Sequence, residues 1–215
     1  MASRLGFSMI GVTFSERSKG GDIAKARELC AGFGIDMVSR IDITVGTRER
    51  LLRALGRMRR LYEIVAVVCT NDVVSHVGAR DRRVDILDFP GNRSLSAGVI
   101  KLALSGETAF EVNANEIIDL QGPPRIRLIS KLRREVGLAE RYGIPIVVSS
   151  GATSKLMLRA PRELAFFAAS LLDMGKQNAL KTVSENPTKI VLRNREKLGP
   201  GFVMPGVKKI VSRGK

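Results

Sequence analysis

Short apolar runs alternate along this chain with longer amphipathic stretches, and this rhythm limits its fold more than any other feature. The runs are rich in Val and Ile and keep no polar alternation, which is typical of parallel strands buried on both faces. We expect strands at Ser8–Phe14, Met37–Val45, Ile64–Thr70, Val84–Phe89, Ala109–Asn113 and Pro145–Ser149. A strand–helix succession of this kind predicts a parallel sheet with right-handed crossovers.

The stretches between the runs predict the helices. Leu51, Leu55 and Met58 recur at helical spacing, for example, and Thr47 precedes them as a capping side chain. The expected helices are Asp22–Phe33, Arg48–Tyr62, Asp72–Ala79, Ser94–Leu104, Pro123–Tyr142, Pro161–Met174, Gln177–Ser184 and Pro187–Leu198, the last with Asn186 as its cap.

These elements favour one α/β domain. No G-x-G-x-x-G motif follows the first strand, so the sequence gives no support for a dinucleotide-binding fold. The repeat of roughly 20–30 residues suits a TIM-like βα-barrel with short loops. Six strands are fewer than the eight of a full barrel, so the ring is smaller or unclosed, or further strands are unrecognisable. We expect a single domain over residues 1–215 with a basic tail at about 199–215.

The charge of the chain predicts a polyanionic partner. There are 36 Lys and Arg residues against 21 Asp and Glu residues, a formal net charge of +15. Nucleic acid is the simplest such partner. The alternative is a highly charged surface of the kind found in thermophilic or halotolerant organisms, but such surfaces usually carry more acidic residues as well as more basic ones. With eight Phe, two Tyr and no Trp, a platform for base stacking is not expected.

Several classes of protein are excluded by the composition. No apolar run approaches ~18 residues, so we expect no membrane span, and the N-terminal residues show no secretory cleavage signal. Cys30 and Cys69 are too few for a disulfide framework or a zinc site, and they indicate a reducing cytoplasm. The only histidine, His76, rules out a hydrolase built on a histidine cluster, and we expect it to be a packed or rim residue.

Carboxylates fall near the carboxyl ends of the expected strands, where barrel active sites lie. They are Asp42, Asp72, Asp88, Glu111 and Asp119. Hard oxygen ligands of this kind could bind Mg²⁺. The alternative is that they cap helices and anchor loops. Since no histidine stands near them as a base or ligand, we expect neither a metal site nor catalytic residues in the protein itself.

Basic residues gather on separate helices and loops. Such faces suit contacts to backbone phosphates, although a charged helix face is usually just a solvated one. The small residues at 149–152 form a turn whose backbone either faces a ligand or packs under the next helix. We expect the residues that contact nucleic acid among Arg50, Arg53, Arg57, Arg60, Arg80, Arg82, Arg83, Arg93, Arg127, Lys131, Arg134, Arg141, Ser149, Ser150, Lys155 and Arg159, and the tail adds Lys208, Lys209, Arg213 and Lys215. We expect the longest helix, Pro123–Tyr142, to contribute more than Arg48–Tyr62.

Several blocks in one order resemble a known family. They are VDILDFPGNR (Val84–Arg93), FEVNANEII (Phe110–Ile118), PIVVSSGA (Pro145–Ala152), the stretch Arg159–Leu164 and SENPTKIVLRN (Ser184–Asn194). In these blocks the chain resembles archaeal ribonuclease P protein component 3, the thirty-kilodalton subunit shared with eukaryotes. The resemblance covers nearly the whole chain.

The resemblance implies a TIM-like barrel of seven strands, related to the polymerase-and-histidinol-phosphatase barrels. Family members open with a strand and helix before the segment matching Arg4–Ser8, which explains six strands here. The resemblance implies a non-catalytic subunit of an endoribonuclease: the RNase P RNA binds Mg²⁺ and removes the 5′ leader of precursor tRNA. The implied partners are that RNA, a ferredoxin-like subunit in a heterotetramer, other RNase P proteins and, indirectly, precursor tRNA. The alternative is a stand-alone metal-dependent barrel phosphoesterase or nuclease.

Overall fold

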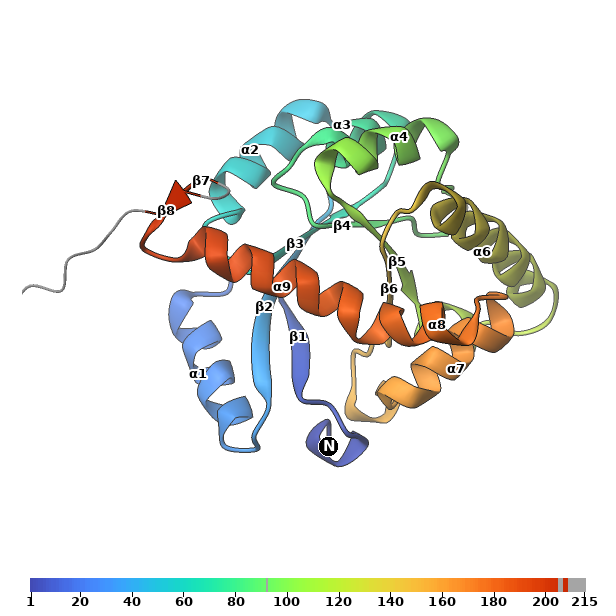
Figure 1. Cartoon of the computed structure of the whole chain (residues 1–215), viewed down its shortest axis with the longest axis horizontal. Helices are drawn as coiled ribbons and strands as arrows, with labels where there is room; N and C mark the ends of the chain where they lie inside the picture. The colour runs from blue at the N-terminus through green and yellow to red at the C-terminus, as the bar shows by residue number, and fades with distance from the viewer. Residues whose placement is uncertain (92, 205–206, 209–215) are drawn as a thin grey trace, which may run out of the picture.

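A curled sheet of six parallel strands forms the centre of the molecule (Figure 1). The computed structural model describes residues 1–91, 93–204 and 207–208. The strands are β1 (Met9–Phe14), β2 (Asp36–Ile43), β3 (Ile64–Val68), β4 (Ile86–Asp88), β5 (Ala109–Asn113) and β6 (Ile146–Ser149). They pair in sequence order, and within the described residues β6 does not pair with β1. The expected TIM-like α/β architecture is therefore confirmed, as a six-stranded half-barrel.

Every expected helix is present. The helices of the described residues are α1 (Gly20–Ala31), α2 (Arg48–Met58), α3 (Asp72–Arg80), α4 (Ala97–Gly106), α5 (Ala114–Ile118), α6 (Gly122–Tyr142), α7 (Pro161–Leu171), α8 (Lys176–Val183) and α9 (Glu185–Leu198), with 3-10 turns at Ser3–Leu5 and Lys155–Met157. The hydroxyl of Thr47 accepts from the Arg50 amide, as expected of a cap. The expectation for Asn186 was wrong: it lies inside α9, and its side-chain amide donates to the Ile146 carbonyl at 2.8 Å.

The main core lies between the convex face of the sheet and the helices that cover it. Inward stripes of α2, α4 and α6 pack on alternate strand residues such as Ile41, Val67 and Phe110, each 2% exposed or less. Burying one such side chain stabilises the fold by about 1.5–3 kcal/mol. These helices hold the strands in a curve and leave the concave side to other elements.

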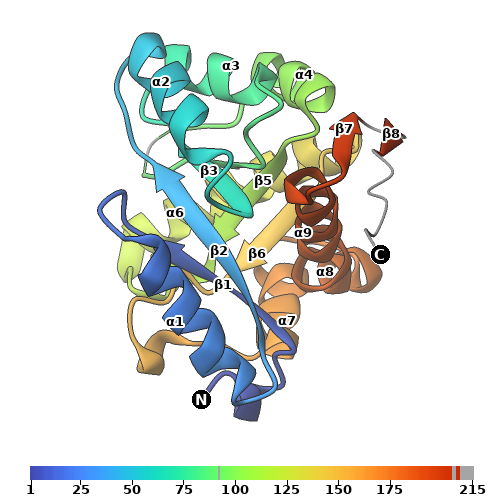
Figure 2. The ribbon, with the colours of Figure 1, turned by 90° about the vertical axis from the view of Figure 1, so that its left-hand side faces the viewer.

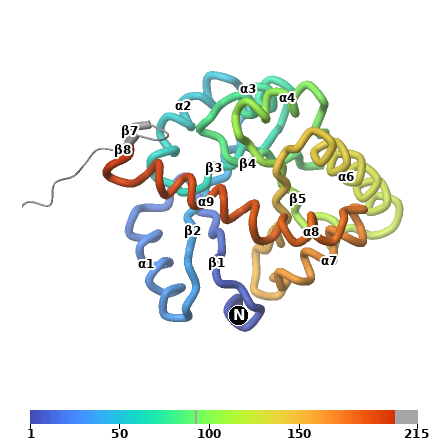
Figure 3. The backbone as a smooth tube through the Cα atoms, in the orientation of Figure 1, coloured from blue at the N-terminus to red at the C-terminus, as the bar shows by residue number. Residues whose placement is uncertain are grey.

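Helix α9 crosses the concave side of the sheet, as the tube in Figure 3 and the turned view in Figure 2 show. Ile190 and Val191 of α9 pack there against a second apolar cluster that includes Val38, Ala66 and Val147. These strand residues come early in their strands, so α9 covers the amino-terminal half of the concave side. The carboxyl-terminal half is left to polar side chains.

Helices α3 and α4 approach so closely that one glycine is required between them. A Cβ atom on Gly106 would lie 2.4 Å from the backbone oxygen of Ala79. No real Cβ contact is that short, and the neighbour is backbone that cannot swing aside. Gly106 therefore fixes the distance between the two helices.

A short hairpin follows α9, formed by β7 (Phe202–Met204) and β8 (Val207–Lys208). Of the expected tail bases, Lys209, Arg213 and Lys215 lie outside the described residues. In the part of the chain that is described, no helix is both long and apolar enough to cross a membrane.

Candidate functional site

A polar cluster occupies the carboxyl-terminal half of the concave side. Side chains alternate between the two faces of a strand, so residues 40 and 42 share the face of Val38. Arg40 and Asp42 come from β2, Asp88 from the end of β4 and Glu111 from β5. In barrel enzymes the active-site residues lie at this carboxyl-terminal end of the strands.

Arg40 connects two strands across this cluster. Its Nη1 and Nη2 atoms donate to the two carboxylate oxygens of Glu111, each at 2.6 Å, and its Nε donates to Asp42 at 2.6 Å. The Glu111 side chain is fully buried and that of Arg40 is 13% exposed. Burial opposes the charge, but the Glu111 and Asp42 carboxylates prevail and raise the pKa of Arg40. The guanidinium is thus a permanent cation in the cluster.

Asp88 lies beside this pair and forms no ion pair within the described residues. Burial raises the pKa of Asp88 to about 7, and the nearby Glu111 and Glu116 carboxylates add to the effect, while Arg40 opposes it. Burial also raises the pKa of Glu116. The cluster therefore holds more carboxylates than it can neutralise.

The carboxylates do not make a metal site. Among the described residues no group of three or more His, Cys, Asp or Glu side chains could hold a metal ion. Arg40 stands where a cation would have to bind, with its donors directed at Glu111 and Asp42. Asp72 instead begins α3 and pairs with Arg93, and Asp119 follows α5. The carboxylates therefore fit Mg²⁺ poorly, and His76 is an exposed residue on the surface of α3.

The turn after β6 packs against its neighbours. The Ser149 hydroxyl lies 2.5 Å from the side-chain oxygen of Asn113, and the Ser150 carbonyl accepts from the Asn115 amide. Gly151 has φ +61°, and a Cβ there would lie 3.3 Å from Asn113. Of the two interpretations of this segment, the geometry favours the packed turn, with Ser149 and Ser150 half-buried.

Some expected RNA contacts are already engaged within the protein. Lys131 is 9% exposed and donates to the Phe89 and Gly91 carbonyls at 3.1 and 2.9 Å, so its placement on an exposed face was wrong. The helical spacing could not reveal these carbonyls, which lie some 40 residues away in sequence. Other candidates have internal partners: Arg57 pairs with Glu16, Arg83 with Asp81 and Arg93 with Asp72, while Arg159 donates to the Leu156 and Leu158 carbonyls.

The remaining candidates are exposed and form no ion pair within the described residues. They are Arg50, Arg53, Arg60, Arg80, Arg82, Arg127, Arg134, Arg141 and Lys155. On α6, Arg127, Arg134 and Arg141 recur every seven residues, so they lie about 10 Å apart along one side of the helix.

A second basic group forms where the ends of α2 and α3 meet. Arg59, directly after α2, donates to the Arg83 carbonyl, and the Arg83 side chain comes within 3.9 Å of the Cβ position of Gly56. The loop that carries Arg80, Arg82 and Arg83 therefore lies against the end of α2. Arg60 at that end completes the group, which sequence spacing within one helix could not predict.

Sequence reasoning did not single out Arg40, Arg193 or Arg195. The α9 arginines are held by carboxylates at the amino ends of the strands: Arg195 by Asp36 and Glu63, Arg193 by Asp85. No local pattern in the sequence marks such pairs, because the partners are 71 to 159 residues apart.

Comparison with known proteins identifies the family. The model of the family "RNase P subunit p30" matches residues 1–198. Ribonuclease P protein component 3 of Methanosarcina barkeri is 29% identical over 78% of this chain and 70% of its own length. The same component of Methanococcoides burtonii is 28% identical over 96% of this chain and 84% of its own length.

A solved structure shares the fold. A chain in the cryo-EM structure of archaeal ribonuclease P with mature tRNA matches with a TM-score of 0.88 and 19% identity, over 99% of this chain and 93% of that one. Since the family model covers nearly all of the sequence, this chain belongs to the RNase P subunit p30 family.

Proposed function

We propose that the chain is a non-catalytic protein subunit of ribonuclease P, the endoribonuclease that removes the 5′ leader of precursor tRNA. It binds and supports the RNA component, which carries the chemistry and the Mg²⁺. The observation that carries the proposal is the separation of charges in the fold. Arg40 is engaged with Asp42 and Glu111 on the concave side, whereas exposed arginines that form no ion pair within the described residues lie on α2, after α3 and along α6.

The arrangement suits phosphate rather than base recognition. Exposed guanidinium groups pair with phosphate oxygens through a planar fork of donors, and they carry no sequence information by themselves. The two groups, one at the end of α2 and α3 and one along α6, would hold a folded RNA at two places. Electrostatic binding of this kind depends steeply on salt.

The partners are proposed on the same basis. Relatives named ribonuclease P protein component 3 and the solved archaeal complex support an assembly with the RNA and with other protein subunits. We propose that a ferredoxin-like subunit joins the chain in a heterotetramer, and that the assembly works in the cytoplasm. Both thiols, Cys30 and Cys69, are free, as a reducing compartment requires.

Reconstitution tests this function. The purified chain with Mg²⁺ or Mn²⁺ is expected to leave precursor tRNA intact, and 5′ maturation is expected to improve when the chain joins the RNA component and the other subunits. Cleavage by the chain alone would support the stand-alone phosphoesterase instead.

Salt dependence tests the mode of binding. If about six phosphates are neutralised, log K should fall against log salt with a slope of roughly −4 to −5. A slope near zero would exclude phosphate contacts as the source of affinity.

A further inference from the structure

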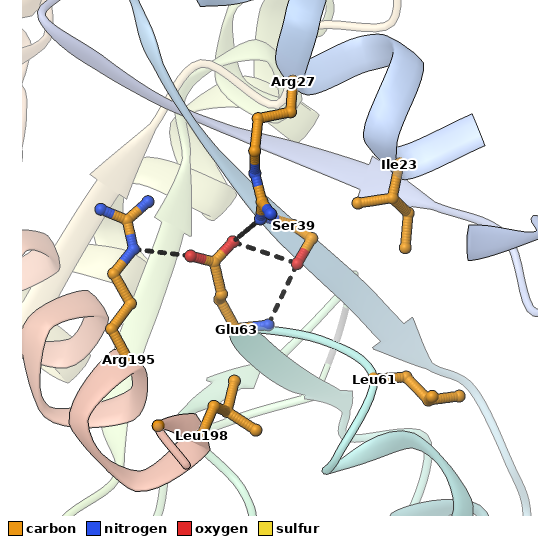
Figure 4. A pocket seen from close by; sticks show the side chains of 8 residues that line it. Ile23, Arg27, Ser39, Leu61, Glu63, Arg195 and Leu198 are labelled. Carbon is orange, nitrogen blue, oxygen red and sulfur yellow. Dashed lines mark hydrogen bonds and ion pairs between the residues drawn. The ribbon is translucent and has the colours of Figure 1, made fainter. Parts of the chain in front are cut away.

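The arginines of this protein are of two kinds: some are held by carboxylates, and others form no ion pair within the described residues. Around the hollow at the carboxyl end of α9, Glu63 accepts from both Arg27 and Arg195, as the dashed lines in Figure 4 show. Guanidinium groups directed at carboxylates in this way offer few donors to a bound anion. A site for an anionic ligand is therefore to be sought among the arginines of the second kind.

Helix α6 carries three arginines of the second kind on one side. Arg127, Arg134 and Arg141 are exposed and form no ion pair within the described residues. Ser130 and Gly137 lie between them along the helix and are exposed as well. All five lie within about 80° around the helix axis. We call these five residues the α6 row, in which long cationic side chains alternate with a short side chain or none.

The α6 row is positively charged from end to end. The two carboxylates of α6 lie elsewhere: Glu135 is buried, and Glu140 accepts from the Asn178 side chain at 2.9 Å. Arg133, beside the row, pairs with Asp173 and does not add to its charge. The complement of such a row is a polyanion.

Neither packing nor backbone conformation within the described residues requires a glycine at position 137. Glycine inside a helix destabilises it relative to alanine. Other glycines have a reason in the fold: Gly106 is confined by the Ala79 oxygen, and Gly143, after α6, has φ +73°. Gly137 is in the helix interior, and no atom of the described residues lies within 4 Å of its Cβ position. The remaining reason for a glycine is a close approach by a ligand from outside the chain.

Helix α2 repeats the spacing. Arg53, Gly56 and Arg60 are three and then four residues apart, as are the last three members of the α6 row. All three are exposed, and Arg60 lies in the turn after α2. The Arg83 guanidinium lies 3.9 Å from the Cβ position of Gly56, so a further cation reaches this gap. The recurrence on both basic helices favours a role of the small residue in the ligand contact.

We infer that the sugar–phosphate backbone of RNA crosses α6 over Gly137, with one phosphate group between Arg134 and Arg141. Along the helix axis Gly137 lies about 4.5 Å from Arg134 and about 6 Å from Arg141. Arginine side chains reach a phosphate placed between them, and their planar forks bind its oxygens. Ser130 marks an equivalent gap between Arg127 and Arg134. The inference rests on the proposed function, because it takes the RNA component of ribonuclease P as the ligand.

Gly137→Gln tests the inference. Gln leaves the charge of the chain unchanged and favours a helix more than Gly, so the thermal midpoint should stay or rise. Its side chain would fill the gap, and the affinity of the full chain for the RNA component, measured by filter binding, should fall about tenfold. The salt slope should become shallower by about 0.7–0.9, the share of one phosphate, although no charge is removed. A merely structural role of Gly137 would change neither the affinity nor the salt slope.

Gly21→Gln is the matched control. Gly21 is exposed in the first turn of α1, with no atom of the described residues within 4 Å of its Cβ position. Helix α1 lies on the opposite side of the molecule from α6 (Figure 1). Gly21→Gln should therefore bind RNA like the parent. Gly137→Ala adds only a methyl group and should weaken binding in the same direction as Gly137→Gln, but less.

Three results would overturn the inference and leave the proposed function intact. The first is equal RNA affinity of Gly137→Gln and Gly21→Gln. The second is a loss of affinity of Gly137→Gln at an unchanged salt slope, which would mean that no phosphate contact was lost. The third is normal RNA binding of Gly137→Gln with weaker binding of another purified subunit, which would assign the α6 row to a protein partner. If the parent chain itself does not bind the RNA component, the proposed function fails together with the inference.

Discussion

Arg40 and Glu111 join β2 to β5 through two parallel hydrogen bonds of 2.6 Å across the concave side of the half-barrel. The pair is shielded from water, with the Glu111 side chain fully buried. Charges in such a place are stable only together, since each alone would have to be held without water or a counter-charge. The pair therefore replaces, in this fold, the cation that a cluster of carboxylates would otherwise require.

We predict that Arg40→Met lowers the free energy of unfolding by about 3–5 kcal/mol, because it leaves Glu111 buried without its counter-charge. Chemical denaturation at pH 8 measures this. The double variant Arg40→Met/Glu111→Leu is the control and should recover most of the loss, since it removes both charges. Equal destabilisation of the single and double variants would show that packing, not charge, explains the effect.

Asp88 should make the stability of the protein depend on pH. Its pKa is raised from 3.8 in the unfolded chain to about 7 by burial and by Glu111 and Glu116. A raised carboxyl pKa means that the folded state holds the proton more tightly, so this group costs stability as pH rises from about 4 to 7 and adds no further cost above 7.

Asp88→Asn removes that cost. We predict that the variant is more stable than the parent at pH 8, by about 2 kcal/mol, since Asp88 is not fully shielded from water. Near pH 3 the difference should nearly vanish, because Asp88 is then mostly protonated in both the folded and the unfolded state. Thermal midpoints at both pH values measure the change, and a gain of equal size at pH 3 and pH 8 would contradict the assignment to Asp88.

Helix α4 offers a test of packing. Gly106→Ala should lower the free energy of unfolding by about 1–3 kcal/mol, because the added Cβ would lie 2.4 Å from the Ala79 oxygen and force α3 and α4 apart. Gly137→Ala, inside α6 with nothing within 4 Å of its Cβ position, should raise it by ~0.5–1 kcal/mol. Urea denaturation of both variants checks the pair. If Gly106→Ala and Gly137→Ala change the free energy of unfolding in the same direction, the close approach at Gly106 does not set the distance between α3 and α4.

The strands and helices could be predicted because their signals are local. Val and Ile runs, caps such as Thr47 and the spacing of Leu51, Leu55 and Met58 all lie within one element. Helix α5 was missed, since five residues are too few for a helical period to show.

The site could be predicted only in part, for the opposite reason. The position of Asp42, Asp88 and Glu111 near strand ends marked them as candidate metal ligands. Whether a cation can bind there depends on Arg40, which donates to Glu111 although the two are 71 residues apart in sequence. Sequence spacing shows which face a residue takes on its own element and not what the next element brings to it.

Two neighbouring bases on α6 show this difference and give a direct test of it. Lys131 donates to the Phe89 and Gly91 carbonyls and lies 4.0 Å from Glu135, while Arg134, three residues on, is exposed. We predict that Lys131→Met lowers the free energy of unfolding by about 2–3 kcal/mol, because two carbonyls lose their donor and the buried Glu135 carboxylate loses a nearby positive charge. Arg134→Ala should leave unfolding unchanged and instead make the salt slope of RNA binding shallower by about 0.7–0.9. Urea denaturation and filter-binding titrations over a range of salt concentrations, on both variants, separate the two roles. A shallower salt slope for Lys131→Met with no loss of stability would mean that Lys131 reaches RNA after all.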